Sequence, residues 1–251
     1  MVMAIGAQQR ARASAAETQF PPIWKEATWP AEWLSLHASP TYYGVGVPRG
    51  DGSPVVVIPG FMSGDALMYE MYAWLGRIGY RAYLSGIALN AGCPGATAQK
   101  LVKVVERAHD ETGERVKIVG HSLGGLLGRR VTLQRPDLVS QLVYLGAPIR
   151  AMHAHPFVTA TAAVAVGLRA LMRSGDRCLT SACGCGLVED MRRSLPPGVD
   201  HAAIYTRGDG VVDWHDARER DPRRNFEVGG THVGLVYNPR AYRVLGELLA
   251  N

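Results

Sequence analysis

The sequence predicts an α/β fold in which helices cover both faces of a mostly parallel sheet. Short runs of β-branched and other apolar residues alternate along the chain with segments whose apolar residues recur at helical spacing. The first run, at 54–59, reads Pro-Val-Val-Val-Ile-Pro, which is typical of a strand buried on both faces. With 251 residues and 47% hydrophobic content, the chain can bury one large core, so we expect a single domain, 1–251.

The expected elements follow in a regular order. A helix of apolar spacing is predicted after the first strand, and a second helix carries Leu101, Val105 and Ala108 on one face. A third helix stops before Pro136. The strands are predicted at 54–59, 80–84, 116–119, 142–145, 202–205 and 225–228, and the helices at 66–78, 97–109, 123–134 and 240–249. In such a sheet, active residues lie at the carboxyl ends of the strands.

One interval breaks this order. About fifty residues, 149–199, separate two predicted strands, where a crossover needs only about a dozen. The interval leaves the carboxyl end of a strand and contains an uncharged apolar run at 157–168, so we expect a cap over the site. A crossover helix with a long surface loop is the alternative. Residues 1–50 are expected to form an N-terminal extension.

Composition excludes some classes of partner. The 27 basic and 22 acidic residues give a net charge of +5, but the arginines are scattered, so no nucleic-acid partner is predicted. The first twenty residues lack the apolar run of a secretory signal, which predicts a cytoplasmic protein. The run at 157–168 is shorter than the ~20 residues that cross a bilayer, so no transmembrane segment is expected. Peripheral contact with lipid and the oligomeric state stay open.

The four cysteines do not by themselves define a redox compartment or a metal site. A zinc site would need Cys178, Cys183 and Cys185 with one of His153, His155 or His201. Because Cys-x-Cys lacks the two-residue gap of common structural zinc sites, packed or disulfide-bonded cysteines are the preferred interpretation. No metal and no organic cofactor is predicted.

The strongest motif is Gly120-His121-Ser122-Leu123-Gly124, which lies between a short apolar strand and a helix. A sharp strand-to-helix turn exposes the serine hydroxyl on a strained backbone, and crowding there admits only small residues two positions to either side. Ser122 is therefore predicted to be a nucleophile.

A serine nucleophile needs a base and an orienting carboxylate, which follow in the order acid, then histidine, on loops after later strands. Asp209 follows the strand at 202–205, and His232 follows the strand at 225–228. Asp213 is the competing acid, because it lies further along the same loop; both it and Asp216 are expected to be solvated or helix-capping residues. Among the other histidines, His121 is expected to support the turn, and the remainder are expected to be surface or packing residues, namely His37, His109, His153, His155, His201 and His215.

The oxyanion of an acyl-transfer reaction needs two backbone N–H donors. Leu123, immediately after the nucleophile, is one candidate. Phe61 is the other, because Pro59-Gly60-Phe61 follows the first strand and Gly60 lets the backbone approach the site. A simple strand-ending turn is the alternative for this loop.

With these motifs in this order, the chain resembles bacterial lipases and esterases of the α/β-hydrolase superfamily. The resemblance covers about 54–251 and rests on the segments 58–61, 120–125, 205–214 and 229–235. It implies that Ser122, Asp209 and His232 form a triad, and that Phe61 and Leu123 donate to the oxyanion. Pro59 stands where many relatives have His-Gly.

The implied function is a serine carboxylester hydrolase that forms an acyl-enzyme on a small-molecule ester. Apolar residues favour an acyl chain as the substrate group; they are Phe61, Met62, Met152, Phe157 and those of 164–168. An acyltransferase using the same triad and a non-catalytic ligand-binding scaffold are the alternatives.

Overall fold

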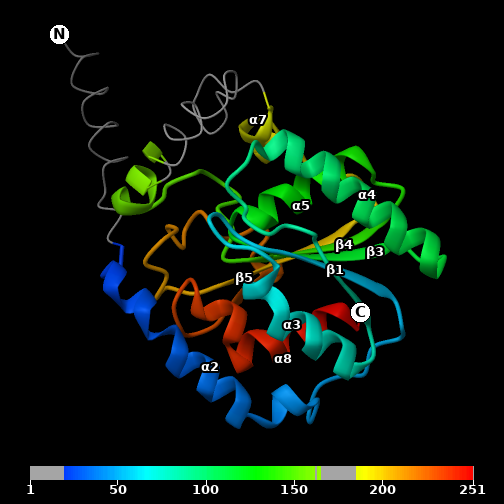
Figure 1. The fold of residues 1–251 in the computed structure, drawn as a ribbon, viewed down its shortest axis with the longest axis horizontal. Coiled ribbons are helices and arrows are strands. Elements are labelled where there is room, and N and C mark those ends of the chain that lie inside the picture. The colour runs from blue at the N-terminus through cyan, green and yellow to red at the C-terminus, as the bar shows by residue number, and fades with distance from the viewer. Residues whose placement is uncertain (1–19, 162, 165–184, 251) are drawn as a thin grey trace.

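The computed structural model describes residues 20–161, 163–164 and 185–250. Within them, six strands form one sheet in the order β2-β1-β3-β4-β5-β6, and every neighbouring pair is parallel. Helices α4 and α5 cover one face of the sheet, and α3 and α8 cover the other (Figure 1). The predicted fold class is confirmed.

All the predicted strands and helices are present, with shifted ends. The strands are β1 (Pro54–Ile58), β2 (Arg81–Leu84), β3 (Val116–His121), β4 (Val139–Leu145), β5 (Asp200–Tyr205) and β6 (Asn225–Glu227). The helices among them are α3 (Asp65–Ile78), α4 (Pro94–Thr112), α5 (Leu123–Gln134) and α8 (Pro239–Leu249). Helix α4 begins earlier than predicted because Pro94 occupies its first turn. Proline is tolerated there, since the N–H groups of the first turn have no partner within the helix.

The continuous apolar pattern of β1 reflects two separate cores. Val55 and Val57 pack with α3 and α8, whereas Val56 and Ile58 pack with α4 and α5. Successive side chains of a strand point to opposite faces, so a strand covered on both sides must be apolar at every position.

The N-terminal segment, residues 20–50, contains more regular structure than the sequence pattern indicates. It contains η1 (Ile23–Thr28), α2 (Trp29–Ala38) and η2 (Pro40–Tyr43). The sequence predicted an N-terminal extension here but none of these three elements. Leu36 is fully buried, and Glu70 of α3 accepts hydrogen bonds from Trp33 Nε1 (3.1 Å) and Tyr42 Oη (2.6 Å). The segment is therefore packed against the domain.

The interval 149–199 is described only at its two ends. Its first part forms an antiparallel bridge between Ala154 and Val212. Its last part forms α7 (Leu187–Arg192), which buried Arg129 of α5 fastens by donating from Nε to the Asp190 carbonyl at 2.9 Å. The rest of the predicted cap, 165–184 with Cys178 and Cys183, lies outside the described residues, so the cap stays a prediction. No helix within the described residues has the length and apolar character to cross a membrane.

The strand order places a site at one edge of the sheet. After β2 the chain returns past β1 to form β3, so the connections from β1 and β3 leave in opposite directions across the sheet. The carboxyl ends of β1 and β3 are direct neighbours, with Ile58 paired to Gly120. A crevice at such a reversal is where ligands bind in open α/β sheets.

Close backbone packing at this edge gives a test of the fold. A Cβ added to Gly124 would overlap the carbonyl oxygens of Ile58 and Pro59, whereas one added to Gly76 of α3 would meet nothing within 4 Å. We expect Gly124→Ala to lower the free energy of unfolding by about 1–3 kcal/mol. Gly76→Ala, a matched control in an exposed helical position, should raise it by up to about 1 kcal/mol. Urea unfolding of both variants measures this, and an unchanged stability for Gly124→Ala would contradict the packing.

Candidate active site

Ser122 lies at the turn between β3 and α5 with a strained backbone, φ 52° and ψ −124°. Non-glycine residues rarely adopt positive φ, and such strain persists only where the surroundings enforce it. Two contacts do so here: Ser122 N–H donates to the Leu145 carbonyl at the end of β4 (2.9 Å), and Gly120 packs directly on the backbone of Gly124. The predicted strand-to-helix turn is thus formed, with Ser122 at its apex.

His232 and Asp209 are joined in a buried pair. His232 Nδ1 lies 2.6 Å from Asp209 Oδ2, and the two residues are 3% and 1% exposed. The other oxygen of Asp209, Oδ1, accepts from the N–H groups of Val211 (2.9 Å) and Val212 (2.7 Å). Because both carboxylate oxygens are occupied, the acid can turn only by breaking hydrogen bonds, and Nδ1 of His232 must carry the proton.

The competing acids have other partners. Asp213 Oδ1 accepts from the backbone and ring of His215 (2.9 and 2.8 Å), and Asp216 Oδ2 lies 2.7 Å from Nδ1 of His153. Of the three aspartates, the structure thus brings Asp209 to His232.

His121 supports the histidine loop. Its Nε2 lies 3.0 Å from the His232 carbonyl, and the two rings pack with centroids 4.7 Å apart. Since Ser122 follows His121 directly, this contact brings the nucleophile candidate beside the base candidate. Within the described residues Ser122 Oγ makes no hydrogen bond; nucleophile–base bonds are often long in unliganded enzymes and tighten with substrate.

The two neighbouring imidazoles have opposite pKa shifts. Complete burial, and secondarily the charge of His232, lowers the pKa of His121 to about 3, so His121 is neutral at physiological pH. Burial also acts to lower the pKa of His232, but the charge of Asp209, its hydrogen bond and the charge of Glu26 together outweigh burial, and the pKa of His232 is raised. A stabilised positive charge on His232 is what a general base requires during the reaction.

The predicted oxyanion loop is held by Asn90, which sequence reasoning missed. Asn90 is 2% exposed. Its side-chain Nδ2 donates to the Pro59 carbonyl (2.8 Å), and its backbone carbonyl accepts from Met62 N–H (2.9 Å). Met62 is the other described non-glycine residue with positive φ, at 56°. Among the backbone hydrogen bonds of the described residues, none uses the N–H of Phe61 or Leu123, which leaves both donors available.

No group of three or more His, Cys, Asp or Glu side chains that could hold a metal ion exists among the described residues. The predicted zinc alternative cannot be placed, since two of its cysteines lie outside the described residues.

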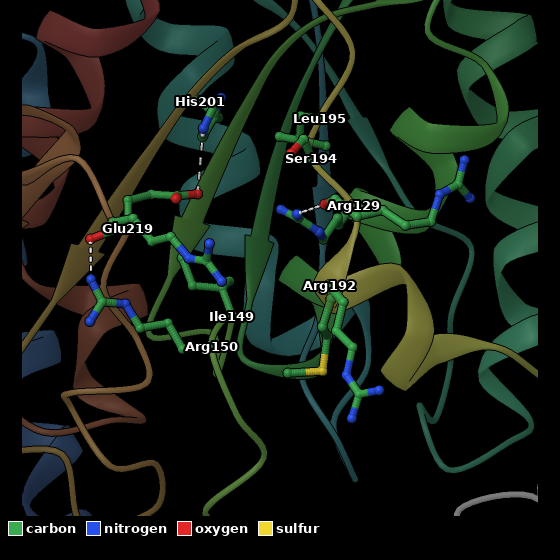
Figure 2. A pocket seen from close by; sticks show the side chains of 11 residues that line it. Arg129, Ile149, Arg150, Arg192, Ser194, Leu195, His201 and Glu219 are labelled. Carbon is green, nitrogen blue, oxygen red and sulfur yellow. Dashed lines mark hydrogen bonds and ion pairs between the residues drawn. The ribbon is translucent and has the colours of Figure 1, made fainter.

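A separate cavity of about 300 Å³ opens beside α5 and α7. Figure 2 shows its lining, in which Glu219 lies between His201 and Arg150. Its arginines are Arg129, Arg150, Arg192, Arg193 and Arg220. This cationic pocket contains none of the residues predicted for the triad or the oxyanion donors.

No family model matches the chain. It is 28% identical over 148 residues to a triacylglycerol lipase of Burkholderia plantarii, covering 54% of this chain and 41% of the relative. It is 30% identical over 115 residues to a triacylglycerol lipase of Pseudarthrobacter phenanthrenivorans, covering 42% and 36%. The match thus spans less than half the length of these relatives.

The solved structures agree on the fold. The Bacillus licheniformis lipase BlEst2 in its mature form superposes with a TM-score of 0.60 and 16% identity, covering 82% of this chain and 95% of that one. The chain therefore has the α/β-hydrolase fold, and the proteins that it resembles include bacterial lipases and esterases.

The low pKa of His121 predicts a pH-dependent contribution to stability. In the unfolded chain His121 binds a proton near its ordinary pKa of 6.5, whereas in the folded protein its pKa is lowered to about 3. His121 therefore destabilises the folded protein progressively as pH falls through this window. Relative to His121→Gln, which cannot titrate, the wild type should lose its stability advantage as pH falls from about 6.5 to about 3. Urea unfolding at several pH values tests this; a constant difference would contradict it.

Proposed function

We propose that this chain is a serine carboxylester hydrolase that forms an acyl-enzyme on Ser122. The buried His232–Asp209 pair, linked through His121 to a strained, turn-mounted serine, is the observation that carries the proposal. The names of the relatives, triacylglycerol lipases, support ester hydrolysis as the reaction class.

In the first half of the reaction, Ser122 Oγ attacks the ester carbonyl carbon while Nε2 of His232 takes the hydroxyl proton. Asp209 keeps the other ring proton on Nδ1 and stabilises the imidazolium that forms. The tetrahedral oxyanion accepts hydrogen bonds from Phe61 N–H and Leu123 N–H, the latter at the positive end of the α5 dipole. His232 then returns the proton to the leaving alcohol.

In the second half, water replaces the alcohol. His232 removes a proton from the water as the water oxygen attacks the acyl carbon. When the second tetrahedral intermediate collapses, the bond to Ser122 Oγ breaks, His232 returns the proton to Oγ, and the acid is released.

Exposed apolar side chains support an acyl chain as the substrate group. Met62 follows the oxyanion loop and is 50% exposed, and Met152 and Phe157, in the segment that bridges to the acid loop, are 50% and 62% exposed. Hydrophobic groups left in water on segments that adjoin a polar site favour an apolar ligand. The interval 149–199 is proposed to contribute this surface as a cap.

Replacing Ser122 tests the proposed nucleophile. Ser122→Ala should reduce kcat for short acyl esters more than about a thousandfold, because no other group can form the acyl-enzyme. Circular dichroism and thermal unfolding should match the wild type, since the hydroxyl makes no hydrogen bond within the described residues. Near-native turnover in a folded Ser122→Ala protein would refute the proposal.

A pair of aspartate variants tests the proposed acid. Asp209→Asn should lower kcat by about a thousandfold or more, because an amide cannot stabilise the imidazolium and favours the wrong tautomer of His232. Asp213→Asn, the matched control on the same loop, should cost far less, since Asp213 contacts His215 instead. Steady-state kinetics with one ester decides between them, and the reverse ranking would reassign the acid.

A further inference from the structure

A glutamate of the N-terminal segment reaches both loops of the proposed triad. Glu26 of η1 accepts through Oε1 from the N–H groups of Gly210 (2.8 Å) and His232 (3.1 Å). Its Oε2 accepts from Val233 N–H (2.9 Å). One carboxylate therefore joins the residue after the acid to the base itself and its successor, across sequence separations of 184 and 206 residues.

Besides the contact between His232 and Asp209, a second side chain links the two loops directly. Thr206 Oγ1 donates to the Gly230 carbonyl (2.8 Å), which links the loops close to their strands. Glu26 links them beyond that point, at the residues that carry the reacting groups. Since three backbone N–H groups converge on one carboxylate, each hydrogen bond is charge-assisted and stronger than a neutral one.

We propose that Glu26 is a positioning residue that sets the His232 loop against the Asp209 loop. The inference deepens the proposed function and rests on it. The N-terminal segment accordingly helps to position the residues of the proposed triad, although it precedes the first strand and contains none of them.

The charged and titratable groups around His232 come from four elements. Asp209 faces Nδ1, and Glu26 lies at the backbone N–H of the same residue. His121 packs on the ring, and its low pKa of about 3 keeps it uncharged. Glu32 of α2 binds the preceding residue, accepting from Thr231 N–H (2.9 Å) and Thr231 Oγ1 (2.7 Å). The charge of Glu26 is among the causes that raise the pKa of His232, whereas that of Glu32 is not.

This difference supplies a matched control. Glu26→Gln and Glu32→Gln each remove one negative charge from the N-terminal segment and weaken its contact with the histidine loop. Only Glu26→Gln also disturbs the contact with Gly210 and with the His232 amide. Loosening of the segment is thus common to both variants, and misplacement of acid against base is specific to the first.

The experiment measures kcat and KM of the full chain on a short p-nitrophenyl ester across the pH range in which histidine titrates. Glu26→Gln should lower kcat by about ten- to a hundredfold with little change in KM, as expected for misplaced catalytic groups. The acidic limb of its kcat/KM profile should move to lower pH, because the imidazolium loses a stabilising charge. In Glu32→Gln, the acidic limb should stay where it is in the wild type, whatever the loss of thermal stability.

Equal losses of kcat and identical pH profiles in the two variants would overturn the proposal, since Glu26 would then act only by holding the segment in place. If Glu26→Gln does not fold, Glu26→Asp takes its place. Aspartate keeps the charge but is shorter by one methylene group, so kcat should fall while the acidic limb stays unchanged; full turnover in a folded Glu26→Asp protein would overturn the positioning role.

Nuclear magnetic resonance of the histidine rings separates this inference from the proposed function. The pKa of His232, read from ring chemical shifts in wild type and Glu26→Gln, should be lower in the variant whether or not the protein hydrolyses esters. Absence of wild-type activity toward any ester would refute the proposed function. Unchanged titration of His232 in Glu26→Gln, in an active enzyme, would refute the role of Glu26 alone.

Discussion

The structure of the site depends on how closely the backbones of β3 and α5 approach each other at Ser122. Gly120 lies against Gly124, and Gly124 in turn lies against the carbonyls of Ile58, the last residue of β1, and of Pro59, which follows it. This contact bends the chain sharply enough to hold Ser122 at φ 52°. Because neighbouring backbone enforces the bend, Ser122 is held at the carboxyl end of the sheet without side chains to hold it there, although only 8% of the residue is exposed.

The remaining groups come to Ser122 through the order of the strands. β4 separates β3 from β5, and β6 lies beyond β5, so the loops after β5 and β6 extend back along the same edge toward the turn. The hydrogen bond between His121 and the His232 carbonyl joins the loop after β6 to the turn that carries Ser122. The N-terminal segment then covers the two loops from outside, with Glu26 and Glu32 turned toward backbone amides. The site is thus built from segments that are distant in sequence but adjacent at one edge.

Much of this arrangement could be predicted because its causes are local. The alternation of apolar strands and helical spacing located every strand of the sheet, and the parallel topology then put Ser122, Asp209 and His232 at one edge. Gly120 and Gly124, two positions to either side of Ser122, predicted the sharp strand-to-helix turn. Asp209 was separated from Asp213 by its place directly after a strand, and the structure brings Asp209 to His232, although the catalytic roles stay predictions.

Other parts left no local signal. Helix α2 has little contrast between its faces and could not be recognised by periodicity. Glu26, Glu32 and Asn90 bind backbone groups, which every residue supplies, so no partner residue in the sequence reveals them. The cap prediction concerns residues that lie mainly outside the described part of the chain, and it therefore rests on the length and apolar character of 149–199 alone.

Reaction with a fluorophosphonate tests the central claim most directly, because the reagent modifies a serine only when a base activates it and an oxyanion site receives the phosphoryl oxygen. Intact-mass measurement and peptide mapping of the treated protein should show one adduct, located on Ser122. The adduct should be absent when Asp209 or His232 is replaced. An unmodified Ser122 in a folded wild-type protein, or an adduct on a different serine, would contradict the account.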